Sequence, residues 1–235
     1  MGVIIDKQLD WTAHIKHLSK KLRSAAALLS KIRHWIPEDH YPKVYHALFE
    51  SHLTYGISVW GGISDSRLNN IFTVQKHCIR VLFGDHESYL DKFRTCARAR
   101  PANEGILGSS FYAREHTKPL FNEQKLLAAR NLYHYFCAVE IFKILKFRLP
   151  MDLYDTYHLS NRETSLTLLT PNRSQQFFYK SSVAWNSIYK KALSKPHSDM
   201  TTKISHFKME LKKILLSHQN EGDKNEWQKS NFELG

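Results

Sequence analysis

The chain is organised around residues 10–60, which begin DWTAHIKHLSKKLRSAAALLSKIRHWIP (residues 10–37). Large apolar residues recur in this segment at steps of three, four and seven, a spacing that places them on one face of an α-helix. Asp10 is placed to cap the first turn, and Pro37 is expected to end the helix after Ile36. The apolar face consists of Trp11, Ile15, Leu18, Leu22, Ala25, Ala26, Leu29 and Ile32.

Basic side chains gather on the opposite face of this helix, at about 100° per residue. We call the set Lys16, Lys20, Arg23 and Lys31 the basic ridge. Such a ridge suits contact with the phosphates of a nucleic acid. The same pattern is typical of the solvated face of an ordinary core helix, so the residues alone leave both interpretations open.

The remainder of the chain is also predicted to be mainly α-helical. A second helix is expected from Pro42 to Thr54, antiparallel to the first, and a third from about residue 65 to Phe83, with Gly84 as its C-cap. Residues 85–118 are expected to form a basic connector with one short helix around 90–99. Further helices are expected at 122–145 and 199–217, with a β-like run at 166–169 and an aromatic stretch at 175–185 between them.

The composition favours a polyanionic partner. The 235 residues include 34 Lys and Arg against 22 Asp and Glu, a formal net charge of +12, which suits nucleic acid or an anionic membrane surface. The three cysteines are widely spaced, as expected in a reducing compartment, and no run of about 18 apolar residues could span a membrane. We therefore expect an intracellular protein of the nucleus, the cytoplasm or both.

No motif for chemistry is found in the chain. There is no glycine-rich phosphate loop, no Gly-x-Ser-x-Gly elbow and no pair of adjacent aspartates for a two-metal site. His14 and His17 lie about one turn apart, but no cysteine or carboxylate completes a zinc site at a familiar spacing. We predict no catalytic residue, no metal and no small-molecule substrate.

Several short sequence blocks, in order, resemble the region that follows the polymerase core in LINE-type (non-LTR) retrotransposon reverse transcriptases. They cover nearly the whole chain, and 85–108 is the weakest part. The blocks are Gly2-Val3-Ile4-Ile5-Asp6, Leu9-Asp10-Trp11, His14-Ile15, Tyr45-His46-Ala47-Leu48-Phe49, His52-Leu53-Thr54-Tyr55-Gly56, Val59-Trp60-Gly61, Val74-Gln75-Lys76, Ile79-Arg80, Phe83-Gly84, Pro119-Leu120-Phe121, Tyr179, Trp185-Asn186-Ser187, Phe207-Lys208 and Leu211-Lys212.

The resemblance implies a division of the chain. Residues 1–9 would be a remnant strand of the polymerase core, with Val3-Ile4-Ile5 at its centre, and 10–84 a thumb-like helical domain. After the connector, 119–218 would be the post-thumb region and 219–235 a disordered tail. The family's catalytic Tyr-x-Asp-Asp motif, which holds Mg²⁺, does not occur here, and neither does the Cys/His knuckle of some members. The chain would thus be inactive without the missing polymerase core.

By the same resemblance, a thumb would hold RNA, DNA or an RNA–DNA hybrid through contacts to phosphates and sugars that do not depend on sequence. We place those contacts on Lys16, Lys20, Arg23 and Lys31, with Arg33 and Lys43 behind them. The alternative is a relic or co-opted helical module for protein–protein interaction, with the aromatic block 133–147 as its exposed surface.

Overall fold

The computed structural model describes residues 2–84, 117–157, 168–169, 176–188 and 203–221. Within them the chain is mainly α-helical and contains no strand, which confirms the predicted fold class. Contacts divide it into two compact units: unit 1 is drawn from residues 1–55, 64–129 and 220–235, and unit 2 from 56–63 and 130–219. No helix in these described ranges is long and apolar enough to cross a bilayer.

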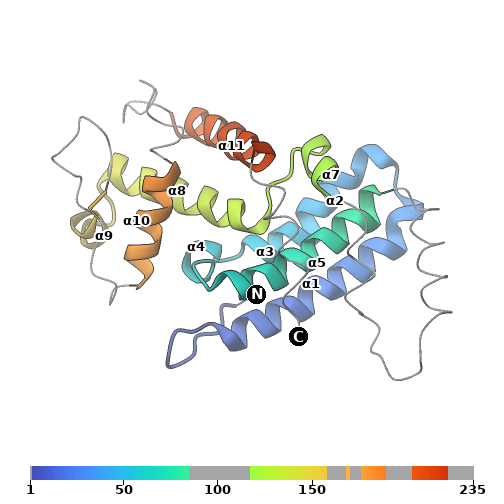
Figure 1. Cartoon of the computed structure of the whole chain (residues 1–235), viewed down its shortest axis with the longest axis horizontal. Coiled ribbons are helices and arrows are strands. Elements are labelled where there is room, and N and C mark those ends of the chain that lie inside the picture. Colours follow the sequence, from blue (N-terminus) through green and yellow to red (C-terminus); the bar gives the residue numbers. More distant parts are fainter. Residues whose placement is uncertain (1, 85–116, 158–167, 170–175, 189–202, 222–235) are drawn as a thin grey trace. The chain divides into compact units, whose positions relative to one another are not determined.

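Two long helices lie side by side in unit 1, α1 (Thr12–Ile32) and α5 (Asp65–Phe83) (Figure 1). The predicted apolar face of α1 is confirmed from Ile15 to Leu29, and His14 is buried with it. On α5 the buried side chains likewise follow the helical repeat, from Leu68 through Ile71 to Leu82. Interlocking of these two apolar faces builds the core of unit 1.

The ends of α1 are set by short polar contacts and by Pro37. The Thr12 backbone N–H and hydroxyl each donate to the Asp10 carboxylate at 2.8 Å, and these bonds lower the pKa of Asp10 to about 2. The α-helix ends at Ile32, and a 3₁₀ turn, η1 (Arg33–Trp35), continues to Pro37. The helix is therefore four residues shorter than predicted, because its final turn tightens into 3₁₀ geometry before the proline.

The predicted second helix is a continuous helical stretch with a change of pitch. After the 3₁₀ turn η2 (Glu38–His40) come α2 (Tyr41–Tyr45), the π-helical turn η3 (His46–Glu50) and α3 (Ser51–Thr54). Both α3 and η3 contact α1, so the helical hairpin predicted from the sequence is confirmed. Its buried side chains, Tyr41, Tyr45, Phe49 and Leu53, repeat every four residues, wider than the ideal 3.6, as a π turn allows.

The expected strand at residues 1–9 does not form in the described part, residues 2–9. β-Propensity alone does not hold an extended segment, which needs a partner strand. Here the Ile4 backbone N–H donates instead to His14 Nδ1 at 3.3 Å, and Ile5 is exposed. The prediction for Val3–Ile5 was wrong because the ladder it requires is missing from the described residues.

Unit 1 also includes α7 (Lys118–Glu123) and the residues that follow it. The helix expected at 122–145 is interrupted: Lys125 adopts a left-handed φ of 50°, and α8 (Ala129–Phe147) begins four residues later. The side chain of Gln75 stabilises this break. Its Nε2 donates to the Leu127 carbonyl at 2.9 Å and to the Tyr45 hydroxyl at 3.0 Å, and its Oε1 accepts from the Ala129 N–H at 2.9 Å.

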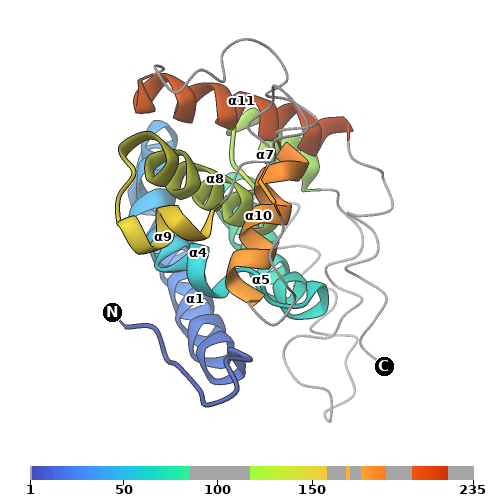
Figure 2. The same cartoon turned by 90° about the vertical axis from the view of Figure 1, so that its left-hand side faces the viewer.

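Unit 2 is built on α8, with α10 (Gln176–Ile188) and α11 (Ile204–Glu221) packed against it (Figures 1 and 2). The Phe142 ring stacks on Phe207 at 4.0 Å between centroids, and Trp185 lies against Phe207. The short helix α4 (Ile57–Trp60) joins α8 through a close approach at Gly61, where an added Cβ would lie 2.6 Å from the Tyr133 ring. Of the aromatic residues of α8, Tyr133 and Phe142 thus belong to the core, whereas Tyr135 and Phe136 are half-buried and Phe147 is exposed.

One expectation in unit 2 needs correction. The polar tail was predicted to begin at 219, but α11 continues to Glu221, and Gln219 is buried and bonded to Asn131 at 3.0 Å. Within the β-like run, Leu168 exchanges two hydrogen bonds of 2.8 Å with the Asn186 side chain. Leu168 also forms a β-bridge, and residues 166–167 of the run lie outside the described residues. Residues 85–116 of the expected connector 85–118, the short helix at 90–99 and residues 222–235 of the expected tail lie outside the described residues, and α7 begins at Lys118, within the expected connector.

A further helix, α9 (Met151–Thr156), follows α8 and is anchored at its end by Tyr157. The Tyr157 hydroxyl shares a 2.8 Å hydrogen bond with Ser181 Oγ on α10. This bond lies between buried side chains, so it fixes the position of α9 within unit 2.

Acid is expected to destabilise unit 1 through His77 on α5. Burial, and to a smaller extent the charge of Arg80, lower the pKa of His77 to about 4. The unfolded chain titrates near the ordinary value of 6.5, so it binds the proton more tightly than the folded chain between pH 6.5 and 4. The free energy of unfolding should therefore fall by about 2–3 kcal/mol as the pH drops through this window.

Urea unfolding of the wild type and of His77→Gln at pH 7 and pH 4.5 measures this contribution. Glutamine does not titrate, so the variant should lose less stability on acidification than the wild type. Equal losses in the two proteins would show that His77 is not the cause.

Candidate nucleic-acid interface

The basic ridge lies on the exposed face of α1. Lys16, Lys20, Arg23 and Lys31 are all exposed, while the opposite face of the helix is buried. From Lys16 to Lys31 the helix rises about 22 Å at 1.5 Å per residue. That length is about two thirds of one turn of a duplex.

No carboxylate neutralises the ridge within the described residues. Residues 11–37 contain no Asp or Glu at all, and no ion pair in the described part of the chain involves a ridge residue. On an ordinary solvated helix, acidic and basic residues usually alternate and pair at i, i+4. The ridge is instead a row of one sign of charge, which raises the local potential for an anion.

The structure separates the two residues that were predicted to stand behind the ridge. Lys43, on α2, is exposed. Arg33 is half-buried, and its guanidinium donates to the main-chain carbonyls of Val81 at 2.7 Å and Gly84 at 2.9 Å. It also lies 5.8 Å from the centre of the Tyr41 ring. Arg33 thus binds the C-terminal end of α5, whose carbonyls lack helical partners, and helps to hold the helices together.

Arg33→Lys is expected to lower the free energy of unfolding by about 2 kcal/mol, because an ammonium group cannot bridge two carbonyls as the guanidinium does. The charge is retained, so affinity for nucleic acid should change little in the folded protein. Urea denaturation and a binding titration of the same preparation measure both quantities. A stable variant with weakened binding would show instead that Arg33 contacts the nucleic acid, as the sequence predicted.

A second group of basic side chains, buried on α5, is distinct from the ridge. Lys76 is 4% exposed, and its ammonium lies 4.7 Å from the centre of the Phe72 ring. Burial, and then the charge of Arg80, lower the pKa of Lys76 to about 8. Because Lys76 and Arg80 are both buried, we assign them to the packing of unit 1 and not to a surface for nucleic acid.

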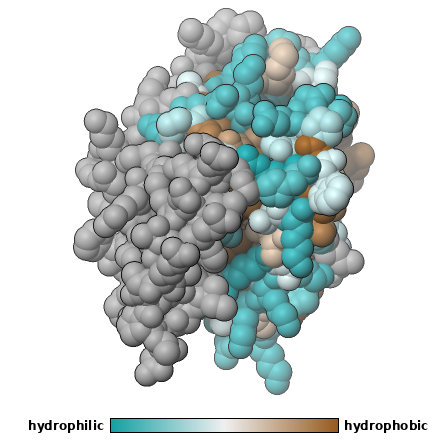
Figure 3. All heavy atoms as spheres, turned by 90° about the vertical axis from the view of Figure 1, so that its right-hand side faces the viewer, coloured by the Kyte–Doolittle hydropathy of each residue, from teal (hydrophilic) through white to brown (hydrophobic). Residues whose placement is uncertain are grey.

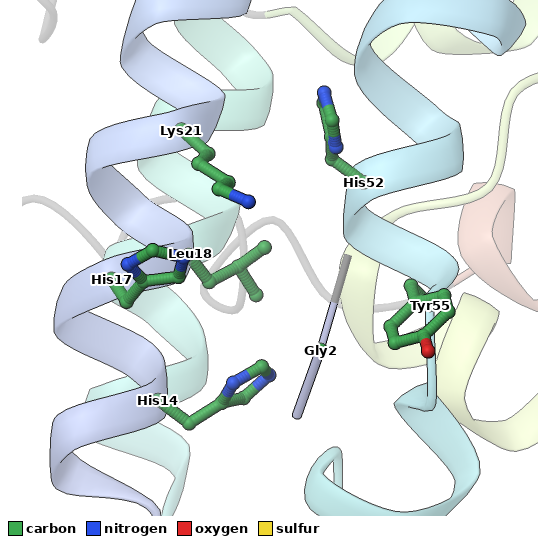
Figure 4. Close-up of a pocket in the computed structure, with 7 residues that line it drawn as sticks. All are labelled: Gly2, His14, His17, Leu18, Lys21, His52 and Tyr55. Carbon is green, nitrogen blue, oxygen red and sulfur yellow. The ribbon is translucent and has the colours of Figure 1, made fainter. Parts of the chain in front are cut away.

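Two features near the ridge were not recognised in the sequence. Trp35 at the end of η1 is 86% exposed, which is unusual for tryptophan. Beside the ridge, a hollow opens between α1 and α3, lined by Gly2, His14, His17, Leu18, Lys21, His52 and Tyr55 (Figure 4). The spacing of His14, His17 and Lys21 at i, i+3 and i+7 is the signal that predicts a shared flank of α1. No local pattern in the sequence predicts that His52 also lines this hollow.

The described residues offer no group of three or more His, Cys, Asp or Glu side chains arranged to hold a metal ion. Cys78 and Cys137 are buried, and burial raises the pKa of each thiol, that of Cys137 to about 12. These thiols are therefore protonated at neutral pH and are poor nucleophiles. The strongest candidate for function in the described structure is a surface that binds anions.

The face shown in Figure 3 is mostly hydrophilic over its described residues, with small hydrophobic areas between them. Elsewhere, Phe147, Leu149 and Met151 are exposed where α8 leads into α9. The rest of the aromatic block proposed as an interaction surface is largely covered, since Tyr133 and Phe142 are buried.

No protein-family model, curated protein or solved structure matches the chain.

Proposed function

We propose that this chain is the thumb and post-thumb part of a LINE-type non-LTR reverse transcriptase, and that it binds template–primer nucleic acid through the basic ridge. The observation that carries the proposal is the exposed, unneutralised row of Lys16, Lys20, Arg23 and Lys31 on a helix with no acidic residue. The assignment to the LINE-type reverse transcriptases is supported by the ordered sequence blocks that resemble that family. Without a Tyr-x-Asp-Asp motif, the chain binds nucleic acid but does not polymerise it.

The ridge offers ammonium and guanidinium groups and no arrangement for reading base edges. Phosphate contacts position a protein on a duplex and carry no sequence information. Binding should therefore be independent of sequence and strongly dependent on salt. The partners of this surface are RNA, DNA or an RNA–DNA hybrid, and in the full enzyme the polymerase core would supply the catalytic Mg²⁺ site.

The test is binding of the purified chain to labelled RNA–DNA hybrids of two unrelated sequences at low salt. We expect equal affinities for the two sequences, and competition by unlabelled duplex of either sequence. Failure of the folded chain to bind any of these duplexes at low salt would contradict the proposal.

A helical protein-interaction module is the second candidate function. The exposed apolar residues Phe147, Leu149 and Met151 favour it, because clustered apolar side chains on a surface often mark a protein contact. Sedimentation of the wild type and of a Phe147→Ser/Met151→Ser variant separates the two functions. Self-association that the variant abolishes, in a chain that does not bind duplex, would favour the interaction module.

A further inference from the structure

Trp35 is the most exposed large apolar side chain in the described part of the chain. Its exposed fraction is 86%, whereas Trp60 and Trp185 are buried in the core. The indole group makes no hydrogen bond and no ring contact with other described residues. Tryptophan usually buries most of its ring, because the ring is large and apolar. Trp35 instead offers a flat aromatic face to a ligand.

The turn that carries Trp35 is held in place by hydrogen bonds of Arg33. The Arg33 guanidinium donates to two main-chain carbonyls at the end of α5. The Arg33 carbonyl in turn accepts from the Tyr41 hydroxyl at 3.2 Å and from the Ile36 N–H at 3.3 Å. A side chain on a fixed turn loses less conformational entropy on binding than one on a loose loop. The position of Trp35 therefore suits a ligand-binding contact.

Trp35 lies just past the C-terminal end of the basic ridge. It follows Lys31, the last ridge residue, by four residues, or about one helical turn. With 1.5 Å per residue in an α-helix and 2.0 Å in a 3₁₀ turn, it stands about 7 Å further along the axis. That length equals about two base steps of a strand, at 3.4 Å per step. A strand whose phosphates lie on the ridge thus brings a base close to the indole ring.

The charges beyond Trp35 favour a base over a further phosphate at this end of the ridge. Residues 11–37 contain no carboxylate, but Glu38 and Asp39 follow directly, and both are exposed. Carboxylates repel phosphate, and this repulsion discourages the backbone from continuing in that direction. A nucleobase carries no charge, and each of the four bases can stack on an aromatic ring.

We propose that Trp35 stacks on an unpaired nucleobase next to the duplex that the ridge holds. The chain then prefers a duplex with a single-stranded extension to a fully paired one. This inference rests on the proposed function, since the ridge positions the strand. Stacking does not read the identity of a base, so the preference is independent of sequence. The competing explanation for an exposed tryptophan is contact with a protein partner.

The test compares RNA–DNA hybrids that carry a short extension at each of the strand ends in turn. One hybrid of each pair has thymine bases in the extension, and the other has abasic residues with the same phosphates. At one end or more, the wild type should bind the thymine hybrid about 5- to 100-fold more tightly, as expected for one stacked base. Trp35→Ala should bind the two hybrids equally. Equal affinities of the wild type at every end would overturn the proposal in favour of a protein contact.

Further variants separate stacking from a general apolar contact. Trp35→Phe keeps an aromatic face and should retain most of the preference for thymine, whereas Trp35→Leu should lose it. Leu28→Ala is the matched control, because Leu28 is an apolar side chain on α1 that is 46% exposed. It should leave the preference unchanged. If Trp35→Leu keeps the preference, or Leu28→Ala abolishes it, stacking by Trp35 is overturned.

The abasic hybrid also separates this proposal from the ridge. Its extension has no base to stack, so the four-residue ridge variant should lose affinity for it. If the ridge variant binds the abasic hybrid as tightly as the wild type, the ridge is overturned, while a thymine preference that Trp35→Ala abolishes still supports stacking. If the folded chain binds no hybrid at low salt, both proposals are overturned.

Discussion

Gln75→Leu is expected to lower the free energy of unfolding by about 4 kcal/mol. Leucine has a similar volume, but it leaves the Leu127 carbonyl and the Ala129 N–H without the partners they have in the wild type. Gln75 itself is 0% exposed, so water cannot replace it. Each buried polar group left unsatisfied costs about 1–3 kcal/mol, and the Tyr45 hydroxyl loses its donor as well.

Urea denaturation followed by circular dichroism measures the effect. Asn70→Leu is the control, because Asn70 lies exposed on the same helix and the substitution likewise replaces an amide side chain by leucine. The control should be as stable as the wild type. If Gln75→Leu were equally stable, the break between α7 and α8 would not depend on this side chain.

The second large effect concerns the ridge. Replacing Lys16, Lys20, Arg23 and Lys31 by alanine removes four positive charges, so the formal net charge falls from +12 to 12 − 4 = +8. Each phosphate contact contributes about 0.9 to the salt exponent of binding, so at 0.1 M salt the loss of four contacts should weaken duplex binding by about 10³- to 10⁴-fold. Alanine is the best helix former, so α1 should stay folded.

A charge-matched variant separates location from net charge. Lys203, Lys208, Lys212 and Lys213 at and along α11 provide the same four charges in unit 2. Their replacement by alanine should weaken binding far less than the ridge variant does, at one fixed salt concentration. Equal losses of affinity would mean that duplex binding depends on the total charge of the chain and not on the ridge.

The helices that the sequence predicted well are those with a long, regular apolar repeat. For α1 and α5 the buried positions follow from spacing alone, because one face of a surface helix must be covered. The prediction was wrong where local geometry breaks the repeat. The left-handed Lys125 interrupts a pattern that looks continuous in the sequence. The π turn at η3 changes only the pitch of a helix that runs through to Thr54 as predicted.

Side chains with distant partners could not be assigned from the sequence. Arg33 resembles the other cations near the ridge, but the carbonyls that it binds lie 48 and 51 residues further along the chain. His52 contributes to the hollow only because α3 packs on α1. The exposure of the ridge, by contrast, follows from its position opposite the apolar face, which the helical repeat alone determines.

The most direct test of the ridge is the salt dependence of binding to an RNA–DNA hybrid, measured for the wild type and the four-residue ridge variant from low to moderate salt. We predict a linear fall of log K with log salt in the wild type, and a slope about 3–4 smaller in magnitude in the variant. Identical slopes, or no binding by a folded wild type at low salt, would contradict the account.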